Sequence, residues 1–133
     1  MLLYFTTVIA IAAVVMVCTA MAGDNGNVEF LAQFGWEVDE KYIEKESFTM
    51  PVEFDEVYEN YNELQKKAGL DLEPYKGKKA VRYTYIVKNY PEATDTAVRA
   101  NVICVGGKPI AGDVMTVELD GFMNPLNFLS DKD

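Results

Sequence analysis

Apolar and polar residues repeat with two different periods along this chain, and each period predicts one kind of element. Between residues 54 and 68 the apolar side chains recur every three or four positions, which predicts an amphipathic helix. Acidic residues open this segment and basic residues close it, an order that suits the helix dipole. The apolar stripe of the predicted helix consists of Phe54, Val57, Tyr58, Tyr61, Leu64 and Ala68.

After residue 78 the period changes to two, which predicts strands. One face of the first strand carries Val81, Tyr83, Tyr85 and Val87. Further strands are predicted over residues 97–105 and 110–119, with Gly106-Gly107 as the hairpin turn between them and Gly112 as a bulge. The residues before Pro51, from Ser47 to Met50, are expected to be extended and to add one more strand.

The remaining apolar segments are short. Asn27 is expected to cap a helix over residues 28–34, and residues 122–129 are apolar enough to pack back on the body. The fold class is therefore α+β: a two-layer domain in which one long and one short helix accompany a three- to four-stranded, mainly antiparallel sheet. The long helix is expected to cover one face by packing Phe54, Val57, Tyr61 and Leu64 on Val81, Tyr83, Tyr85 or Val87.

Residues 1–22 carry no charged side chain and are long enough to span a membrane. Two interpretations stay open: an uncleaved anchor, or a signal peptide cleaved after Ala20-Met21-Ala22. Lipid attachment at Cys18 fits less well, because Val17 precedes the cysteine where a small residue is needed, and a buried core helix is disfavoured because the segment is apolar on every side. Residues 23–26 read as a linker and 27–133 as one domain, which we expect to be extracytoplasmic, membrane-anchored or secreted.

The charge lies entirely outside that apolar segment. All 12 basic and 21 acidic residues follow residue 22, and the net charge is −9. A strongly acidic domain argues against nucleic acid as a partner, because phosphate binding requires a basic patch. Adhesion to an anionic lipid surface is disfavoured for the same reason, so membrane contact is expected through residues 1–22 only.

The residue types present exclude several kinds of catalytic chemistry. The chain has no histidine, and Ser47 and Ser130 are its only serines, so His-based triads, the usual zinc sites and serine-nucleophile motifs are not predicted. No metal or other cofactor is predicted. Cys104 lies in an apolar run and is expected to be a buried, inert thiol. Carboxylates between Glu37 and Glu46 are dense enough for acid–base work, but their polar surroundings favour a solvated loop.

Two surfaces are candidates for binding. Lys76, Lys78, Lys79 and Arg82 form a basic cluster that could meet an anionic polymer or an acidic partner; the alternative is a solvated face paired with acidic residues of the 53–63 helix. The second surface combines Tyr90 and Pro91, in a loop, with Lys108 at the hairpin, because strand ends commonly present contact residues. The alternative for this surface is that both segments are only turns.

Several stretches resemble one known family. The motifs are Phe30-Leu31-Ala32-Gln33-Phe34-Gly35-Trp36-Glu37-Val38, residues 57–66, Arg82-Tyr83-Thr84-Tyr85, residues 107–114 and Asp120-Gly121-Phe122-Met123. Together they are similar to domain of unknown function 4830, a family of Gram-positive bacteria. The resemblance implies an N-terminal hydrophobic segment followed by one small extracytoplasmic domain, over nearly all of residues 28–126. It implies no catalytic or binding residues.

These observations favour a non-enzymatic protein-binding or accessory module whose partner is an unknown envelope protein or cell-wall component. The main alternative is a carboxylate-dependent hydrolase that acts on cell-envelope material. A structural accessory domain of a larger envelope complex is a third class. A deep pocket with two convergent carboxylates would favour the enzyme, and an edge-exposed sheet would favour binding.

Overall fold

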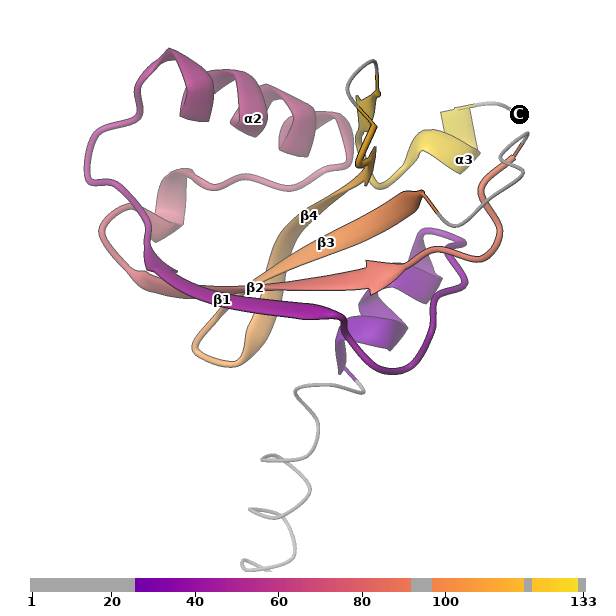
Figure 1. The fold of residues 1–133 in the computed structure, drawn as a ribbon. Helices are drawn as coiled ribbons and strands as arrows, with labels where there is room; N and C mark the ends of the chain where they lie inside the picture. Colours follow the sequence, from indigo (N-terminus) through magenta and orange to yellow (C-terminus); the bar gives the residue numbers. More distant parts are fainter. Residues whose placement is uncertain (1–25, 92–96, 119–120, 132–133) are drawn as a thin grey trace, which may run out of the picture.

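The computed structural model describes residues 26–91, 97–118 and 121–131 (Figure 1). The membrane segment predicted over residues 1–22 lies outside these ranges. Within them, no helix has both the length and the apolar character that crossing a membrane requires.

The described chain begins with a helix over residues 26–33 and continues into a five-stranded antiparallel sheet with the order β1-β2-β3-β4-β5. The elements are β1 (Glu44–Thr49), α2 (Glu56–Lys67), the 3-10 turn η1 (Glu73–Tyr75), β2 (Lys79–Ile86), β3 (Val98–Val105), β4 (Lys108–Thr116), β5 (Met123–Asn124) and α3 (Phe128–Asp131). The α+β class is confirmed. The predicted count of three to four strands is one or two too low, and the strand that was not predicted is β5, from the tail.

Local sequence accounts for the ends of the main elements. Asp55 caps α2 by accepting a hydrogen bond from the amide of Tyr58 at 2.9 Å. Gly106 and Gly107 both have positive φ, 60° and 78°, which the tight turn between β3 and β4 requires.

The predicted bulge is displaced by two residues. The register between β3 and β4 shifts at Ile103 and Cys104, whose partners are Ala111 and Pro109, so Ile110 is the extra residue. Gly112 pairs regularly with Val102. A glycine is needed there for another reason: a Cβ atom would lie 2.4 Å from the carbonyl oxygen of Asn101.

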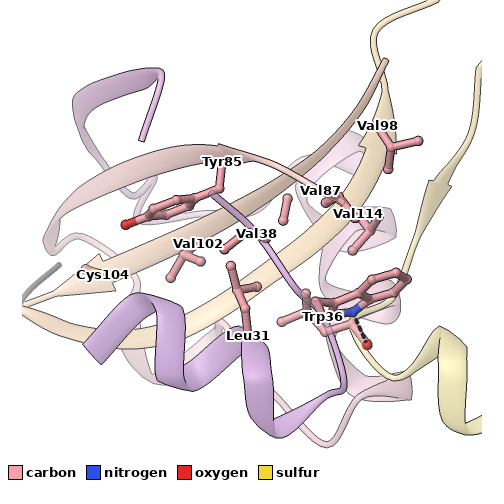
Figure 2. Packing of buried hydrophobic residues seen from close by; sticks show 11 residues of the cluster. Leu31, Trp36, Val38, Tyr85, Val87, Val98, Val102, Cys104 and Val114 are labelled. Atoms are coloured by element: carbon pink, nitrogen blue, oxygen red, sulfur yellow. Dashed lines mark hydrogen bonds between the residues drawn. The ribbon is translucent and has the colours of Figure 1, made fainter. Parts of the chain in front are cut away.

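Helices cover both faces of the sheet, and each face has its own core (Figure 1). The first core lies between the helix over residues 26–33 and the strand face that carries Tyr85, Val102 and Val114 (Figure 2). Tyr85 is fully buried, and its hydroxyl accepts a hydrogen bond from Asn27 Nδ2 at 3.2 Å. The predicted two-layer arrangement is therefore wrong, since a third layer is present.

The second core lies on the opposite face and is smaller. It contains Met50, Leu72, Ala80, Ile103, Ile110 and Ala111, with Phe54, Tyr58 and Tyr61 packed against it from α2 and the segment before it. The expected packing of the long helix on Val81, Tyr83, Tyr85 or Val87 is therefore wrong. Those β2 side chains face the helix over residues 26–33, because alternate residues of a strand point to opposite faces.

The predicted packing of the tail on the body is confirmed. Leu126 is fully buried in the first core. Its carbonyl oxygen accepts a hydrogen bond of 2.8 Å from Trp36 Nε1, the dashed line in Figure 2. This bond satisfies the indole nitrogen of a side chain that is only 2% exposed.

Candidate functional site

A groove of about 560 Å³ lies between α2 and the face of the sheet that carries the second core. We call it the helix–sheet groove. Its polar lining consists of Glu46, Asn60, Arg82 and Asp113, and its apolar lining of Phe48, Val57, Tyr58, Tyr61, Leu64, Ile103 and Met123. Mostly apolar walls with a few polar groups, at this volume, are typical of ligand-binding sites.

The groove exists because α2 is attached to the body through polar side chains. The two buried residues of this helix are Asn62 and Gln65. Gln65 Oε1 accepts a hydrogen bond from the amide of Gly112 at 2.9 Å, and Asn62 Oδ1 accepts one from the amide of Leu72 at 2.7 Å. The apolar stripe is thereby turned toward the groove and is only partly covered by the sheet.

Val57 shows this partial coverage most clearly. Its side chain lines the groove, yet it is 72% exposed. A stripe of this period is expected to be buried, since burying a valine stabilises a fold by about 1.5–3 kcal/mol. An exposed stripe residue beside a groove therefore marks an apolar surface that is available to a ligand.

Tyr61 and Asp113 form the polar floor of the groove, and they end a chain of hydrogen-bonded polar side chains that crosses three strands beneath it. Thr84 Oγ1 donates to Asn101 Oδ1 at 2.7 Å, and Asn101 Nδ2 donates to Asp113 Oδ1 at 3.0 Å. The second carboxylate oxygen of Asp113 accepts a hydrogen bond from the hydroxyl of Tyr61 on α2. Both oxygens of this carboxylate are therefore occupied by partners within the protein, which fixes the position of Tyr61 at the groove floor.

Burial dominates the electrostatics of this floor. Asp113 is 2% exposed, and desolvation raises the pKa of its carboxyl, although hydrogen bonds from Tyr61 and Asn101 and the charge of Arg82 act in the opposite direction. Burial also raises the pKa of the Tyr61 phenol well above its usual value, and the negative charge of Asp113 adds to that effect. The phenol is therefore a hydrogen-bond donor at neutral pH.

A more solvated ion pair lies where the groove meets β1. Arg82 on β2 and Glu46 on β1 are directly opposite in the register, and Arg82 Nη2 lies 2.9 Å from Glu46 Oε2. Both side chains are exposed, so the pair adds little to stability. Among the described residues, no group of three or more His, Cys, Asp or Glu side chains converges as a metal site would require.

The predicted loop-and-hairpin surface is not formed, because its two parts lie at opposite ends of β3. Lys108 follows the hairpin at one end, whereas Tyr90 and Pro91 precede β3 at the other. Tyr90 is also half-buried rather than an exposed aromatic. Its ring stacks on Trp36, Phe122 and Phe128, with centroid distances of 5.8, 4.8 and 5.4 Å. Its hydroxyl accepts a hydrogen bond from Asn124 Nδ2 at 3.0 Å.

The basic residues singled out from the sequence are also distributed over different surroundings. Lys76 pairs with Glu73 at 2.9 Å and lies over the ring of Phe54, and Lys78 lies over Tyr75. Lys79 and Arg82 differ by three positions along β2, so they point to opposite faces of the sheet. Arg82 is the one of these four that lines the helix–sheet groove.

The groove residues themselves were assigned to the core by the sequence pattern. Periodicity identifies Val57, Tyr61 and Leu64 as one stripe, but a stripe that lines a groove has the same period as one that is buried. Asp113 offered a signal: its carboxylate lies between Ala111-Gly112 and Val114-Met115 in a predicted strand, an apolar environment in which charged groups are rare unless they have partners. Cys104, predicted to be buried, is buried, and its thiol contacts Asn27 Oδ1 at 3.1 Å.

Fold and groove together define a small α+β domain with a preformed apolar site between a helix and an antiparallel sheet. Comparison with protein families identifies the group: the family described as "Domain of unknown function (DUF4830)" matches residues 30–114. The chain belongs to this family. No curated protein and no solved structure matches it.

Proposed function

We propose that this domain is a non-enzymatic, extracytoplasmic binding module, membrane-anchored or secreted, and that the helix–sheet groove is its binding site. The observation that carries the proposal is the exposed apolar stripe of α2, with Val57 72% exposed over a groove of about 560 Å³. A ligand that covers this stripe removes from water the apolar surface that the fold itself leaves exposed, and this removal favours binding. The uncharged character of residues 1–22 supports the extracytoplasmic location.

The alternative function, a carboxylate-dependent hydrolase acting on envelope material, finds one favourable feature in the groove. Glu46 and Asp113 both line it, and burial raises the pKa of Asp113, as a general acid requires. Two contacts favour binding instead. Both oxygens of Asp113 are engaged by Tyr61 and Asn101, and the carboxylate of Glu46 is paired with Arg82. Neither carboxylate is thus poised to move a proton to or from a substrate.

The proposed site can be tested by site-specific photocrosslinking with the full chain in intact cells. A photoreactive residue replaces Val57 in one variant and Val52 in the other, because Val52 is 74% exposed but does not line the groove. We expect a crosslinked species from position 57 that is absent from position 52. The same species should disappear when Leu64→Glu, a change in the groove wall, is added to the position 57 variant. Equal crosslinking from both positions, or none from position 57, overturns the assignment of the groove.

The hydrolase alternative has its own test. Purified cell-wall material is incubated with the wild-type protein and with the Asp113→Asn variant, and soluble fragments are measured over time. We expect no release above buffer from either protein. Release by the wild type that the Asp113→Asn variant abolishes would establish the enzyme in place of the binding module.

A further inference from the structure

We propose that the ligand of this domain is an extended, basic peptide segment that adds a strand to the outer edge of β1 and places alternate side chains in the helix–sheet groove. The inference rests on the proposed function, because it names the class of ligand that the same groove takes. It is carried by the backbone geometry of β1 together with the charge beside it.

The hydrogen-bonding pattern of the sheet shows which residues of β1 point outward. Val87 N donates to Val98 O at 3.1 Å. The backbone groups of odd-numbered residues of β2 therefore bond to β3, and the backbone groups of even-numbered residues point toward β1. Met50 N donates to Lys78 O at 2.8 Å in the same register as β1 and β2. The even-numbered residues of β1 therefore bond to β2, and the backbone groups of Lys45, Ser47 and Thr49 point away from the sheet.

These outward groups form an edge on which a further strand can pair. The register directs the amides and carbonyls of Lys45, Ser47 and Thr49 away from β2, and no loop or side-chain hydrogen bond to them is found within the described residues. An extended peptide can bond to such a row of alternating donors and acceptors, and binding by strand addition gains its affinity from these main-chain bonds. A lipid or another ligand without a peptide backbone cannot satisfy them in this way.

The edge and the groove are continuous. Glu46 and Phe48 project from β1 into the groove, on the face that α2 covers. Side chains of an added strand that lie opposite these two residues share their face, because paired residues of neighbouring strands point the same way. Every second side chain of the peptide would thus face Val57 and Tyr58 on α2, while the peptide backbone pairs with β1.

The acidic residues beside the β1 edge favour basic peptides over acidic ones. Glu44 and Glu46 lie on the groove side of β1, and Glu44 forms no ion pair within the described residues. The whole chain has a net charge of −9. Basic side chains on the peptide would therefore be attracted to this edge, and acidic ones repelled.

A second copy of this chain fits the edge less well. Antiparallel pairing of two β1 strands centred on Lys45 places Glu44 opposite Glu46, a repulsive contact. Pairing centred on Ser47 places Glu46 opposite Phe48. Neither register forms an ion pair across the interface, whereas a basic peptide can pair with Glu44, because Glu46 is already paired with Arg82.

The test uses the full chain in lipid nanodiscs and two synthetic dodecapeptides, one of repeated Val-Thr-Lys-Thr and one of repeated Val-Thr-Glu-Thr, so that one face of the added strand carries both apolar and charged side chains. Hydrogen–deuterium exchange is measured at single residues with and without peptide. We expect the basic peptide to slow exchange at the amides of Lys45, Ser47 and Thr49, with little change at Glu46 and Phe48, whose amides already bond to β2. The acidic peptide should bind more weakly. Protection spread equally over odd and even residues, or equal binding of both peptides, overturns the proposal.

Two variants separate the failure of strand addition from the failure of the groove. Ser47→Pro removes one outward amide without removing a bond to β2 and should weaken binding of the basic peptide roughly tenfold, whereas Ser47→Thr, which keeps the amide, should bind like the wild type. Val57→Asn makes the groove wall polar without changing its charge. Binding that survives Ser47→Pro but not Val57→Asn overturns strand addition and leaves the groove as the site. Binding that survives both overturns the two proposals together.

Protection of the same amides that depends on protein concentration without peptide would identify a second copy as the occupant.

Discussion

Gln65 on α2 accepts a hydrogen bond, through its Oε1 atom, from the backbone amide of Gly112 on β4 at a distance of 2.9 Å. Strand β5 pairs only with Val114 and Met115, so the amide of Gly112 lies beyond the last strand partner on that side. Gln65 supplies the missing acceptor. A helix residue thus completes the hydrogen bonding of the sheet, and this contact holds α2 at the position that leaves the groove open.

Replacing Gln65 with leucine should lower the free energy of unfolding by about 1–3 kcal/mol, because the buried amide of Gly112 loses its acceptor. Urea unfolding followed by circular dichroism measures this change. Glu63→Ala is the matched control on the same helix, and it should shift stability by less than about 0.5 kcal/mol since Glu63 is exposed. Equal effects of the two changes would show that the bond between Gln65 and Gly112 is not important for stability.

The close approach at Gly112 predicts that even the smallest side chain is poorly tolerated there. A Cβ atom at this position would lie 2.4 Å from the carbonyl oxygen of Asn101 and 3.1 Å from Leu126 Cδ1. Gly112→Ala should therefore destabilise the domain by about 1–3 kcal/mol or more. Gly26→Ala is the control, because nothing lies within 4 Å of a Cβ atom there, and alanine favours the helix. A melting temperature of Gly112→Ala equal to that of the wild type would contradict the observed geometry.

The raised pKa of Asp113 predicts a definite pH dependence. Below its ordinary value of 3.8, the carboxyl is protonated in both the folded and the unfolded state. As the pH rises toward the higher folded value, the unfolded state releases its proton first, so the unfolding free energy falls. The stability of the wild type relative to Asp113→Asn should therefore decrease as the pH rises above about 4, until the folded state also releases its proton.

Asp71 provides a control of opposite sign for that measurement. Hydrogen bonds from Asn62 and from the amide of Glu73 lower the pKa of Asp71 below 3.8. Its contribution to stability is present above the ordinary pKa and is lost as the pH falls through the lower folded value. Relative to Asp71→Asn, the wild type should thus gain stability as the pH rises toward 3.8. Parallel pH profiles for the two variants would contradict the assigned directions.

The difference between groove and core can be measured with two leucines. Leu126 is fully buried in the first core, whereas Leu64 is half-buried and lines the groove. Leu126→Ala should lower the unfolding free energy by about 2–5 kcal/mol, the usual range for a buried leucine. Leu64→Ala should lower it by less than about 2 kcal/mol, because part of its surface is already in contact with water. If Leu64→Ala lowers the unfolding free energy as much as Leu126→Ala does, Leu64 lies in a closed core, and the groove is not open to a ligand.

Sequence periodicity predicted the elements of this fold better than their arrangement. The long helix, the three strands of the meander and the burial of the tail follow from local patterns that depend on a few neighbouring residues. The face of the sheet against which α2 lies does not, because both faces of β2 carry apolar side chains: Val81 and Tyr85 on one, Ala80 and Ile86 on the other. The polar contacts of Asn62 and Gln65 attach α2 to one of these faces, and such contacts with residues of other segments leave no local pattern in the sequence.

The groove was not predictable for a related reason. Its apolar wall has the period of a core stripe, and its polar floor joins Tyr61, Thr84, Asn101 and Asp113, which are far apart in sequence. Hydrogen bonds between distant side chains leave no local pattern. Tyr90 shows the reverse case: a loop position next to proline predicts exposure, whereas three aromatic rings from distant segments enclose it.

The bond between the indole of Trp36 and the carbonyl of Leu126 has a consequence for how the protein is made. The two residues are 90 positions apart, so the first core closes only after almost the entire domain has been synthesised. While Leu126 is still inside the ribosome this contact cannot form, and Trp36 stays without its hydrogen-bond acceptor. The first core is thus completed late, by a segment that follows all five strands of the sheet in the chain.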